Sequence, residues 1–174
     1  MAGPYVTIDL EKIAHNARMI TRLCARHGIA VTGVTKGTCG LPEVARAMLR
    51  GGVVSIGESR LQNLHRLKAS GIATPYMLLR LPPLSEVDDV VTSVDISLNS
   101  EVAVLATLSA AACRRGLVHV IIIMVDLGDL CEGVWPDDLL PFVRDIITLP
   151  GIRLVGLGTN LSCYGGVVPS EDNM

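Results

Sequence analysis

The chain has 174 residues, of which 49% are hydrophobic and 18% are charged, and its formal net charge is −2. These values fit a folded globular domain with a substantial core and exclude an intrinsically disordered chain. No basic patch offers a footprint for nucleic acid, and aromatic residues, at 3%, are too few to build base-stacking surfaces.

The five cysteines are widely spread and contain no C-x-x-C pair. This spacing argues against a disulfide framework and against a structural zinc site, so we expect reduced thiols and no bound metal. The amino terminus does not resemble a signal peptide, and the longest apolar run, residues 120–125, is too short to span a membrane. We therefore expect a cytoplasmic protein without membrane or nucleic-acid partners.

The predicted elements alternate between strands and helices. Asp9 and Ser59 are the predicted N-caps of two helices, and Pro42 fits the first turn of another. In chain order, the sequence predicts a short strand over 5–8, a helix over 10–27, a strand over 31–35, a helix over 42–49, a strand over 53–56, a helix over 60–69, a strand over 76–79, a short helix from 85, a strand over 94–98, a helix over 101–115, a strand over 118–125, a helix over 137–148 and a strand over 154–157.

This alternation indicates a parallel sheet, because parallel strands need crossover connections. The strands after the first helix are continuous apolar runs, as in sheets covered on both faces. A polar residue stands at or just past the end of each of these six strands: Lys36, Glu58, Arg80, Asn99, Asp126 and Asn160.

Six strands with polar carboxyl ends favour an α/β fold of the (β/α)8 barrel type. A doubly wound sheet is the rival, but the sequence holds neither G-x-G-x-x-G nor a P-loop motif. A full barrel has eight strands and about 250 residues. We therefore expect a barrel truncated after about six strands, or one completed by a partner, with an open edge that promotes association.

Lys36 directly follows one of the most apolar strands. An amine at the carboxyl end of a barrel strand, if desolvated, can form a Schiff base with an aldehyde cofactor. The alternative is an ordinary solvated lysine in a loop.

Taken together, several segments resemble the alanine racemase superfamily, and within it most the ornithine racemase group of predicted amino-acid racemases. The resemblance implies a pyridoxal 5'-phosphate (PLP)-binding (β/α)8 barrel, of which residues 1–174 form the amino-terminal part, with the remaining barrel strands and the family's carboxyl-terminal β domain absent from this sequence. The segments that carry it are Val6-Thr7-Ile8-Asp9, Val34-Thr35-Lys36, Ser59-Arg60-Leu61-Gln62-Asn63-Leu64, Met77-Leu78-Leu79-Arg80-Leu81-Pro82, Asp95-Ile96-Ser97-Leu98-Asn99-Ser100-Glu101, Met124-Val125-Asp126-Leu127-Gly128-Asp129-Leu130 and Asn160-Leu161-Ser162-Cys163-Tyr164-Gly165.

The resemblance further implies a PLP-dependent amino-acid racemase, an isomerase of amino-acid metabolism. Its implied substrate is ornithine or another basic amino acid, with alanine as the alternative, and its implied form is a homo-oligomer, namely a dimer. Lys36 would form the internal aldimine with PLP and act as one acid/base. The residues implied to bind the cofactor are Lys36, Arg80, Asn99, Asp126, Cys131 and Asn160.

Two positions depart from the family pattern. Cys131 stands where the family usually has an arginine, and a thiol cannot replace the forked donors of a guanidinium. The family's second acid/base comes from a domain that this sequence does not contain. Tyr164 is the catalytic candidate for that role, with Cys163 beside it, and the alternative is that both only line a loop.

The family's phosphate-binding loop would also lie beyond Met174, so we expect weak or no PLP binding and little activity by this chain alone. Other readings stay open: a non-catalytic PLP-binding homeostasis protein, or an inactive fragment. Among the remaining polar residues, the acidic group of Asp126, Asp129 and Glu132 is expected to be a solvated loop, and His119 is expected at a surface or helix end.

Overall fold

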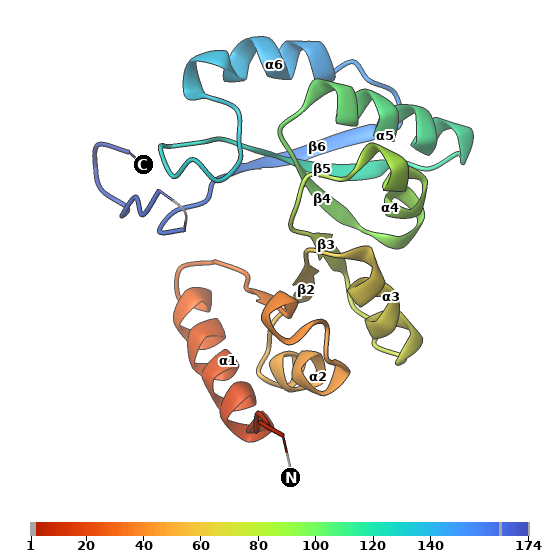
Figure 1. The fold of residues 1–174 in the computed structure, drawn as a ribbon. Helices are drawn as coiled ribbons and strands as arrows, with labels where there is room; N and C mark the ends of the chain where they lie inside the picture. Colours follow the sequence, from red (N-terminus) through yellow and green to blue (C-terminus); the bar gives the residue numbers. More distant parts are fainter. Residues whose placement is uncertain (1–2, 164, 174) are drawn as a thin grey trace. The chain divides into compact units, whose positions relative to one another are not determined.

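The computed structural model describes residues 3–163 and 165–173 (Figure 1). These residues form six strands that alternate with helices, and the chain divides after Tyr76 into two compact units. Within each unit the strands pair in parallel, and strands that follow one another in the chain are neighbours. The predicted α/β class with parallel strands is therefore confirmed.

The first unit contains two complete strands and three helices. Its elements are α1 (Leu10–Ala25), β1 (Thr32–Val34), the 3-10 turn η1 (Lys36–Thr38), α2 (Pro42–Arg50), β2 (Ser55–Glu58) and α3 (Leu61–Ala69). Gly33 of β1 lies opposite Ile56 of β2. The amide of Ile56 in turn donates to the Pro75 carbonyl at 3.0 Å, directly before β3 (Tyr76–Leu78) begins.

Helix α1 begins at a capped end and packs on α2. Oδ1 of Asp9 accepts a 3.0 Å hydrogen bond from the Lys12 amide, so the predicted N-cap is confirmed. At the end of α2, a side chain on Gly51 would collide with Ala17 of α1. The absence of a Cβ at Gly51 thus lets the helices approach closely, and the Thr21 hydroxyl donates to the Gly51 carbonyl at 2.9 Å.

The core of the first unit consists of small and branched apolar side chains. Because they recur at helical spacing on α2 and α3, both helices bury one face. The buried residues on these helices and on β2 are Val44, Ala45, Ala47, Ile56, Leu61, Leu64 and Leu67.

The second unit contains four parallel strands. Its elements are β3, the 3-10 turn η2 (Leu84–Glu86), α4 (Val87–Ser93), β4 (Ile96–Asn99), α5 (Val102–Arg114), β5 (His119–Met124), the 3-10 turn η3 (Pro136–Asp138), α6 (Leu139–Ile146) and β6 (Ile152–Gly158). Helix α5 packs beside both α4 and α6. The core of the second unit includes Val90, Leu105, Leu108, Ile121 and Ile123.

The pairing of β5 with β6 contains one irregularity. Ile121 lies opposite Leu154, whereas Ile122 lies opposite Gly156, so that Val155 is an extra residue in β6. Such a bulge bends the strand locally and increases its twist.

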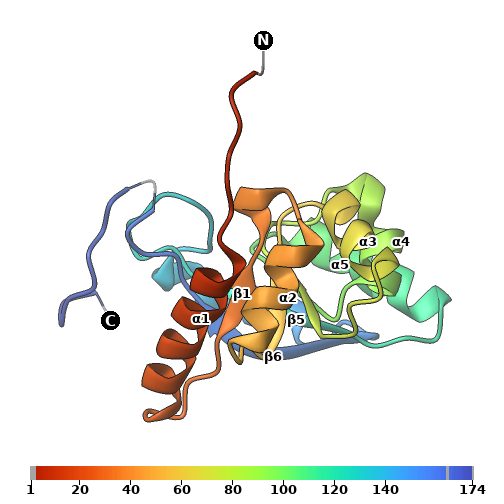
Figure 2. The same ribbon diagram turned by 90° about the horizontal axis from the view of Figure 1, so that it is seen from below.

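Most predicted elements are confirmed to within a few residues, but two details were wrong. Tyr5–Ile8 forms no strand: Tyr5 and Val6 are 84% and 88% exposed, and the segment extends away from α1 (Figure 2). Ser59 does not cap α3, because its amide and hydroxyl both donate to Oε1 of Glu58; the N-cap is Arg60, whose side chain makes no capping bond.

No helix in the described ranges is both long enough and apolar enough to cross a membrane.

Candidate active site

Lys36 begins η1 immediately beyond β1, in a loop that closes on the Thr35 carbonyl. This carbonyl accepts from the Thr38 amide at 3.0 Å, the Thr38 hydroxyl at 3.1 Å and the Gly40 amide at 3.2 Å. Cys39 adopts the left-handed conformation with φ 52°, and its carbonyl accepts from the Arg66 guanidinium at 2.7 Å. The backbone that carries Lys36 is therefore fixed from both sides.

Thr35 and Glu58 anchor this loop to the unit's interior. The Thr35 hydroxyl donates to Oε2 of Glu58 at 3.0 Å, and both residues are buried. The Thr35 amide also donates to the Gly57 carbonyl at 3.1 Å, which extends the pairing of β1 with β2. Glu58 was predicted to lie on a polar rim, but its carboxylate points inward and pairs with the residue next to Lys36.

Lys36 itself is exposed. The desolvated amine that the strand pattern suggested is therefore not found, because β1 ends at Val34 and the chain turns outward into η1. A carbonyl compound from solution can reach an exposed amine on a fixed loop. In this exposed position the amine is also hydrogen-bonded by water.

Asn99, the last residue of β4, lies in a buried polar row. Its Nδ2 donates to the Ser97 carbonyl at 3.0 Å and to the Ser97 hydroxyl at 2.9 Å. The Ser97 hydroxyl lies 2.8 Å from Nε2 of His119. Oδ1 of Asn99 is buried and accepts no hydrogen bond from the described residues. Since buried polar atoms are nearly always paired, this oxygen is suited to meet a donor from a ligand.

His119 is buried on β5, so its predicted surface position was wrong. Burial lowers the pKa of His119 to about 4, against a partly opposing effect of the Asp95 carboxylate. The imidazole is therefore neutral near pH 7. The alternation of side chains along β5 could have predicted this burial. Side chains two residues apart in a strand lie on the same face, and His119, Ile121 and Ile123 share the inward face.

The loop after β5 is organised by two aspartates. Oδ1 of Asp126 accepts from the Gly128 amide at 2.8 Å and the Leu130 amide at 3.1 Å. Asp129 is only 1% exposed, so its predicted place in a solvated loop was wrong. Its Oδ1 accepts from the Cys163 amide at 3.0 Å and the Val167 amide at 3.4 Å in the loop after β6.

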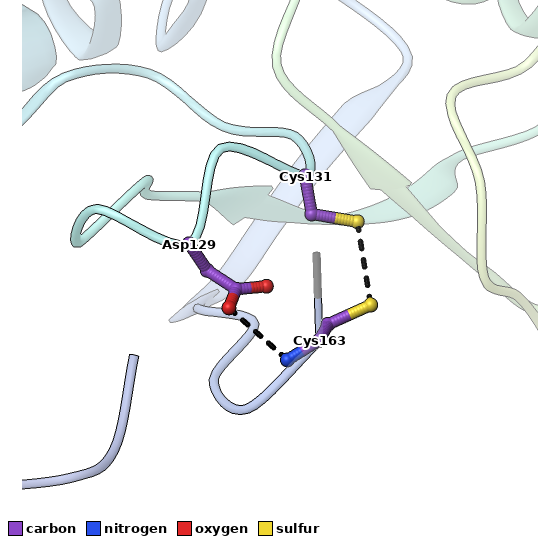
Figure 3. Close-up of side chains that lie close together, drawn as sticks. All are labelled: Asp129, Cys131 and Cys163. Atoms are coloured by element: carbon purple, nitrogen blue, oxygen red, sulfur yellow. Dashed lines mark hydrogen bonds between the residues drawn. The ribbon is translucent and has the colours of Figure 1, made fainter. Parts of the chain in front are cut away.

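Two further contacts join the loops after β5 and β6. Nδ2 of Asn160 donates to Oε1 of Glu132 at 3.2 Å, and the sulfurs of Cys131 and Cys163 lie 3.8 Å apart (Figure 3). Desolvation, the contact with Cys163 and the neighbouring acidic groups raise the pKa of the Cys131 thiol. Cys131 and Asn160, both predicted from the resemblance, thus lie in one loop cluster of the second unit.

Two predicted residues remain. Arg80 lies two residues past β3, and its guanidinium is exposed. Tyr164, the predicted second acid/base, lies outside the described residues.

Parallel strands joined by helices, with polar side chains at or just past their carboxyl ends, define a domain of the (β/α)8-barrel type. Residues 8–173 match the family described as "Alanine racemase, N-terminal domain". The chain belongs to this family.

The similar proteins agree with this assignment. The chain is 43% identical over 172 residues to an ornithine racemase of Acetoanaerobium sticklandii, covering 98% of this chain and 48% of that protein. It is 38% identical over 172 residues to a lysine racemase of Thermotoga maritima, covering 99% and 48% respectively. The chain thus spans about half the length of these curated relatives.

A solved structure shows the same fold. The alanine racemase from D-cycloserine-producing Streptomyces lavendulae superposes with a TM-score of 0.80 at 22% identity, over 90% of this chain and 42% of that one.

Proposed function

We propose that this chain supplies the cofactor-binding lysine of a PLP-dependent racemase that acts on a basic amino acid. The observation that carries the proposal is Lys36: an exposed lysine at the carboxyl end of the first strand, on a loop fixed by Thr35 and Arg66, in a chain of the alanine racemase family. The similarity to racemases along almost the whole chain supports the same assignment.

The side chains present fit such a cofactor. PLP carries an aldehyde, a ring with polar substituents and an anionic phosphate. Lys36 offers an exposed amine for the aldehyde, and Arg80 offers an exposed cation. Oδ1 of Asn99 offers a buried acceptor that the described residues leave unpaired. In the first unit we assign Lys36 to the cofactor aldehyde. In the second unit we assign Arg80 to an anionic group of the cofactor or substrate and Asn99 to a donor group of either, whereas Asp126 and Asn160 act by shaping their loops.

When bound, PLP supplies an electron sink for the negative charge that develops at the substrate's α-carbon. Lys36 holds the cofactor through Nζ. The same Nζ, once free to act as a base, accepts the α-proton on one face of the substrate and can return it to that face. The hydrogen bonds around the Thr35 carbonyl fix the backbone from which this side chain extends, which limits the backbone entropy lost in reaching the reactive geometry.

Racemisation also needs a proton carrier on the opposite face. We propose Tyr164 for this role, with Cys163 as the neighbouring alternative. The Cys163 amide is held by Asp129, so the backbone that leads into this position is anchored to the loop after β5.

Ornithine or lysine is the proposed substrate rather than alanine. The ornithine and lysine racemases are 43% and 38% identical to this chain, whereas the alanine racemase of Clostridium perfringens strain SM101 is 28% identical over 160 residues. A longer cationic substrate side chain would need an acidic or carbonyl partner, and Glu132 is one candidate in the loop after β5.

We also propose a cytoplasmic homodimer. All five cysteines are unpaired, which suits a reducing compartment. Strand β6 pairs with β5 along one edge and carries the exposed apolar side chains Val155 and Leu157, a surface suited to association.

The test is to incubate the purified 174-residue protein with PLP, reduce with borohydride and map the modified peptide. We expect the adduct on Lys36 and its loss in Lys36→Ala. Lys12→Ala is the matched control, because Lys12 is also exposed and pairs only at the surface with Asp9 at 3.6 Å. An adduct that persists in Lys36→Ala would contradict the proposal.

Activity is then measured as interconversion of the enantiomers of ornithine, lysine and alanine by chiral chromatography. We expect ornithine or lysine to be preferred. A specific Lys36 adduct combined with alanine preference would overturn the substrate assignment and leave the cofactor assignment intact.

A further inference from the structure

Three side chains with metal-binding atoms converge where the loops after β5 and β6 meet. They are Asp129, Cys131 and Cys163 (Figure 3). One carboxylate oxygen and the two sulfurs all lie within 4.8 Å of one another. The carboxylate is buried, whereas both cysteines are exposed, so the cluster is open to solutes on the sulfur side.

The separation of the two sulfurs fits a thiophilic metal. A tetrahedral Zn²⁺ binds thiolate sulfur at about 2.3 Å, which places two sulfurs of one site about 3.8 Å apart. The Cys131 and Cys163 sulfurs are 3.8 Å apart. A carboxylate oxygen joins such a site at about 2.0–2.2 Å from the metal, which places it about 3.6 Å from each sulfur. The Asp129 oxygen already lies within 4.8 Å of both sulfurs.

We propose that Asp129, Cys131 and Cys163 form a binding site for a thiophilic divalent cation, with Zn²⁺ as the expected ion and water in the fourth position. This site goes beyond the racemase function and does not rest on it. It assigns Cys163 to the metal and therefore goes with Tyr164, not Cys163, as the second proton carrier. Its ligands come from two loops that are far apart in sequence, since Cys131 and Cys163 are 32 residues apart. For that reason the spacing of the cysteines did not predict it.

The charges around the cluster favour a cation. On binding, Zn²⁺ displaces one proton from each thiol, and the two thiolates and the Asp129 carboxylate then bring three negative charges to the ion. Glu132, the neighbour of Cys131, adds another carboxylate nearby, and it is held toward the cluster's loops by Asn160 at 3.2 Å.

The bound ion would tie the two loops together. Asp129 already accepts from the Cys163 amide at 3.0 Å, so the loops need little rearrangement to place their ligands. Gly165 keeps the two backbones close, because a Cβ there would lie 2.6 Å from the Asp129 carbonyl, and Gly133 keeps the loop after β5 folded back on the Asp126 amide.

The competing outcome is a disulfide. The sulfurs would then approach to about 2.05 Å, and an oxidant such as a peroxide would have to accept the two electrons and two protons. Reduced protein distinguishes the two outcomes, because only the metal site forms without an oxidant.

The experiment titrates the fully reduced 174-residue protein with Co²⁺, which gives a thiolate-to-cobalt absorbance band in sulfur-containing tetrahedral sites, and then displaces Co²⁺ with Zn²⁺. We expect one equivalent of Co²⁺, a thiolate band, and loss of the band on adding Zn²⁺. Cys131→Ser and Cys163→Ser are each expected to weaken binding by at least about tenfold and to reduce the band.

Cys113→Ser is the matched control, since Cys113 is an exposed thiol on α5 of the same unit. It should bind as the unchanged protein does. Circular dichroism checks that each variant is folded. The proposal is overturned if the reduced protein gives no thiolate band, if Cys131→Ser keeps it unchanged, or if Cys113→Ser alone removes it.

Discussion

The hydroxyl of Thr35 donates a 3.0 Å hydrogen bond to Oε2 of Glu58, between two buried side chains at the carboxyl ends of β1 and β2. Thr35 precedes Lys36, and its carbonyl holds the turn that follows. One residue thus connects the interior of the first unit to the loop that carries the proposed cofactor lysine.

Thr35→Val should therefore lower both the stability of the protein and the reactivity of Lys36 toward PLP. Valine keeps the shape but leaves the buried carboxylate without this donor, which costs about 1–3 kcal/mol in the free energy of unfolding. Urea denaturation followed by circular dichroism measures the loss, and the yield of the Lys36 adduct should fall as well. Thr107→Val is the control, because the Thr107 hydroxyl donates only to the Ala103 carbonyl one turn earlier in α5, in an exposed hydrogen bond. Equal losses in both variants would argue against a special role for Thr35.

The buried imidazole of His119 should make stability depend on pH. Its pKa is about 4 in the folded chain, against about 6.5 when unfolded. Between these values the unfolded chain binds more protons, so the free energy of unfolding falls as pH drops from 6.5 to 4, by up to about 3 kcal/mol.

Urea denaturation at pH 7 and pH 4.5 tests this dependence. His119→Gln cannot titrate but keeps an amide for the Ser97 hydroxyl. In this variant the difference in the free energy of unfolding between the two pH values should be smaller by the contribution of His119. If the free energy of unfolding changed equally with pH in the variant and in the unchanged protein, His119 would not be the cause of the pH dependence.

Gly133 should not tolerate a side chain. Its φ is 139°, and an added Cβ would collide with the Asp126 amide and lie 2.7 Å from the Val125 carbonyl carbon. Gly133→Ala should lower the free energy of unfolding by at least about 1 kcal/mol. Gly156→Ala is the matched control, because an added Cβ there meets no atom of the described residues within 4 Å. Thermal unfolding compares the two.

The exposed face of β6 should mediate self-association. Val155 and Leu157 are 48% and 57% exposed there. Leu157→Lys should shift sedimentation toward the monomer, because it places a charge within the apolar surface. Val118→Lys, at an equally exposed apolar residue outside β6, should leave sedimentation unchanged. A protein that is monomeric at all concentrations would exclude the proposed dimer.

The strands and helices could be predicted because their signals are local. Continuous apolar runs marked β1 to β6, and Asp9 marked the start of α1. Lys36 followed from its place at a strand end and from the family resemblance. The sequence left open whether Lys36 is desolvated or is a solvated loop lysine, and the turn made by η1 places it in the exposed position.

Asp129 could not be recognised as buried for a different reason. Its partners Cys163 and Val167 are 34 and 38 residues away, and no local pattern indicates that these loops meet. The proximity of the Cys131 and Cys163 sulfurs could not be predicted for the same reason. Contacts between two irregular loops have no periodicity that a sequence could display.

The contact between the loops after β5 and β6 should affect local unfolding, which amide hydrogen exchange measures. The amides of Cys163 and Val167 donate to Asp129, while Gly128 and Leu130 donate to Asp126 in the same cluster. None of these four amides belongs to a helix or strand. The amides of Cys163 and Val167 should nevertheless exchange their hydrogens slowly and at similar rates, because releasing either of them requires the two loops to separate as a cooperative unit. The amides of Gly128 and Leu130 bond within their own loop and should exchange independently of that separation.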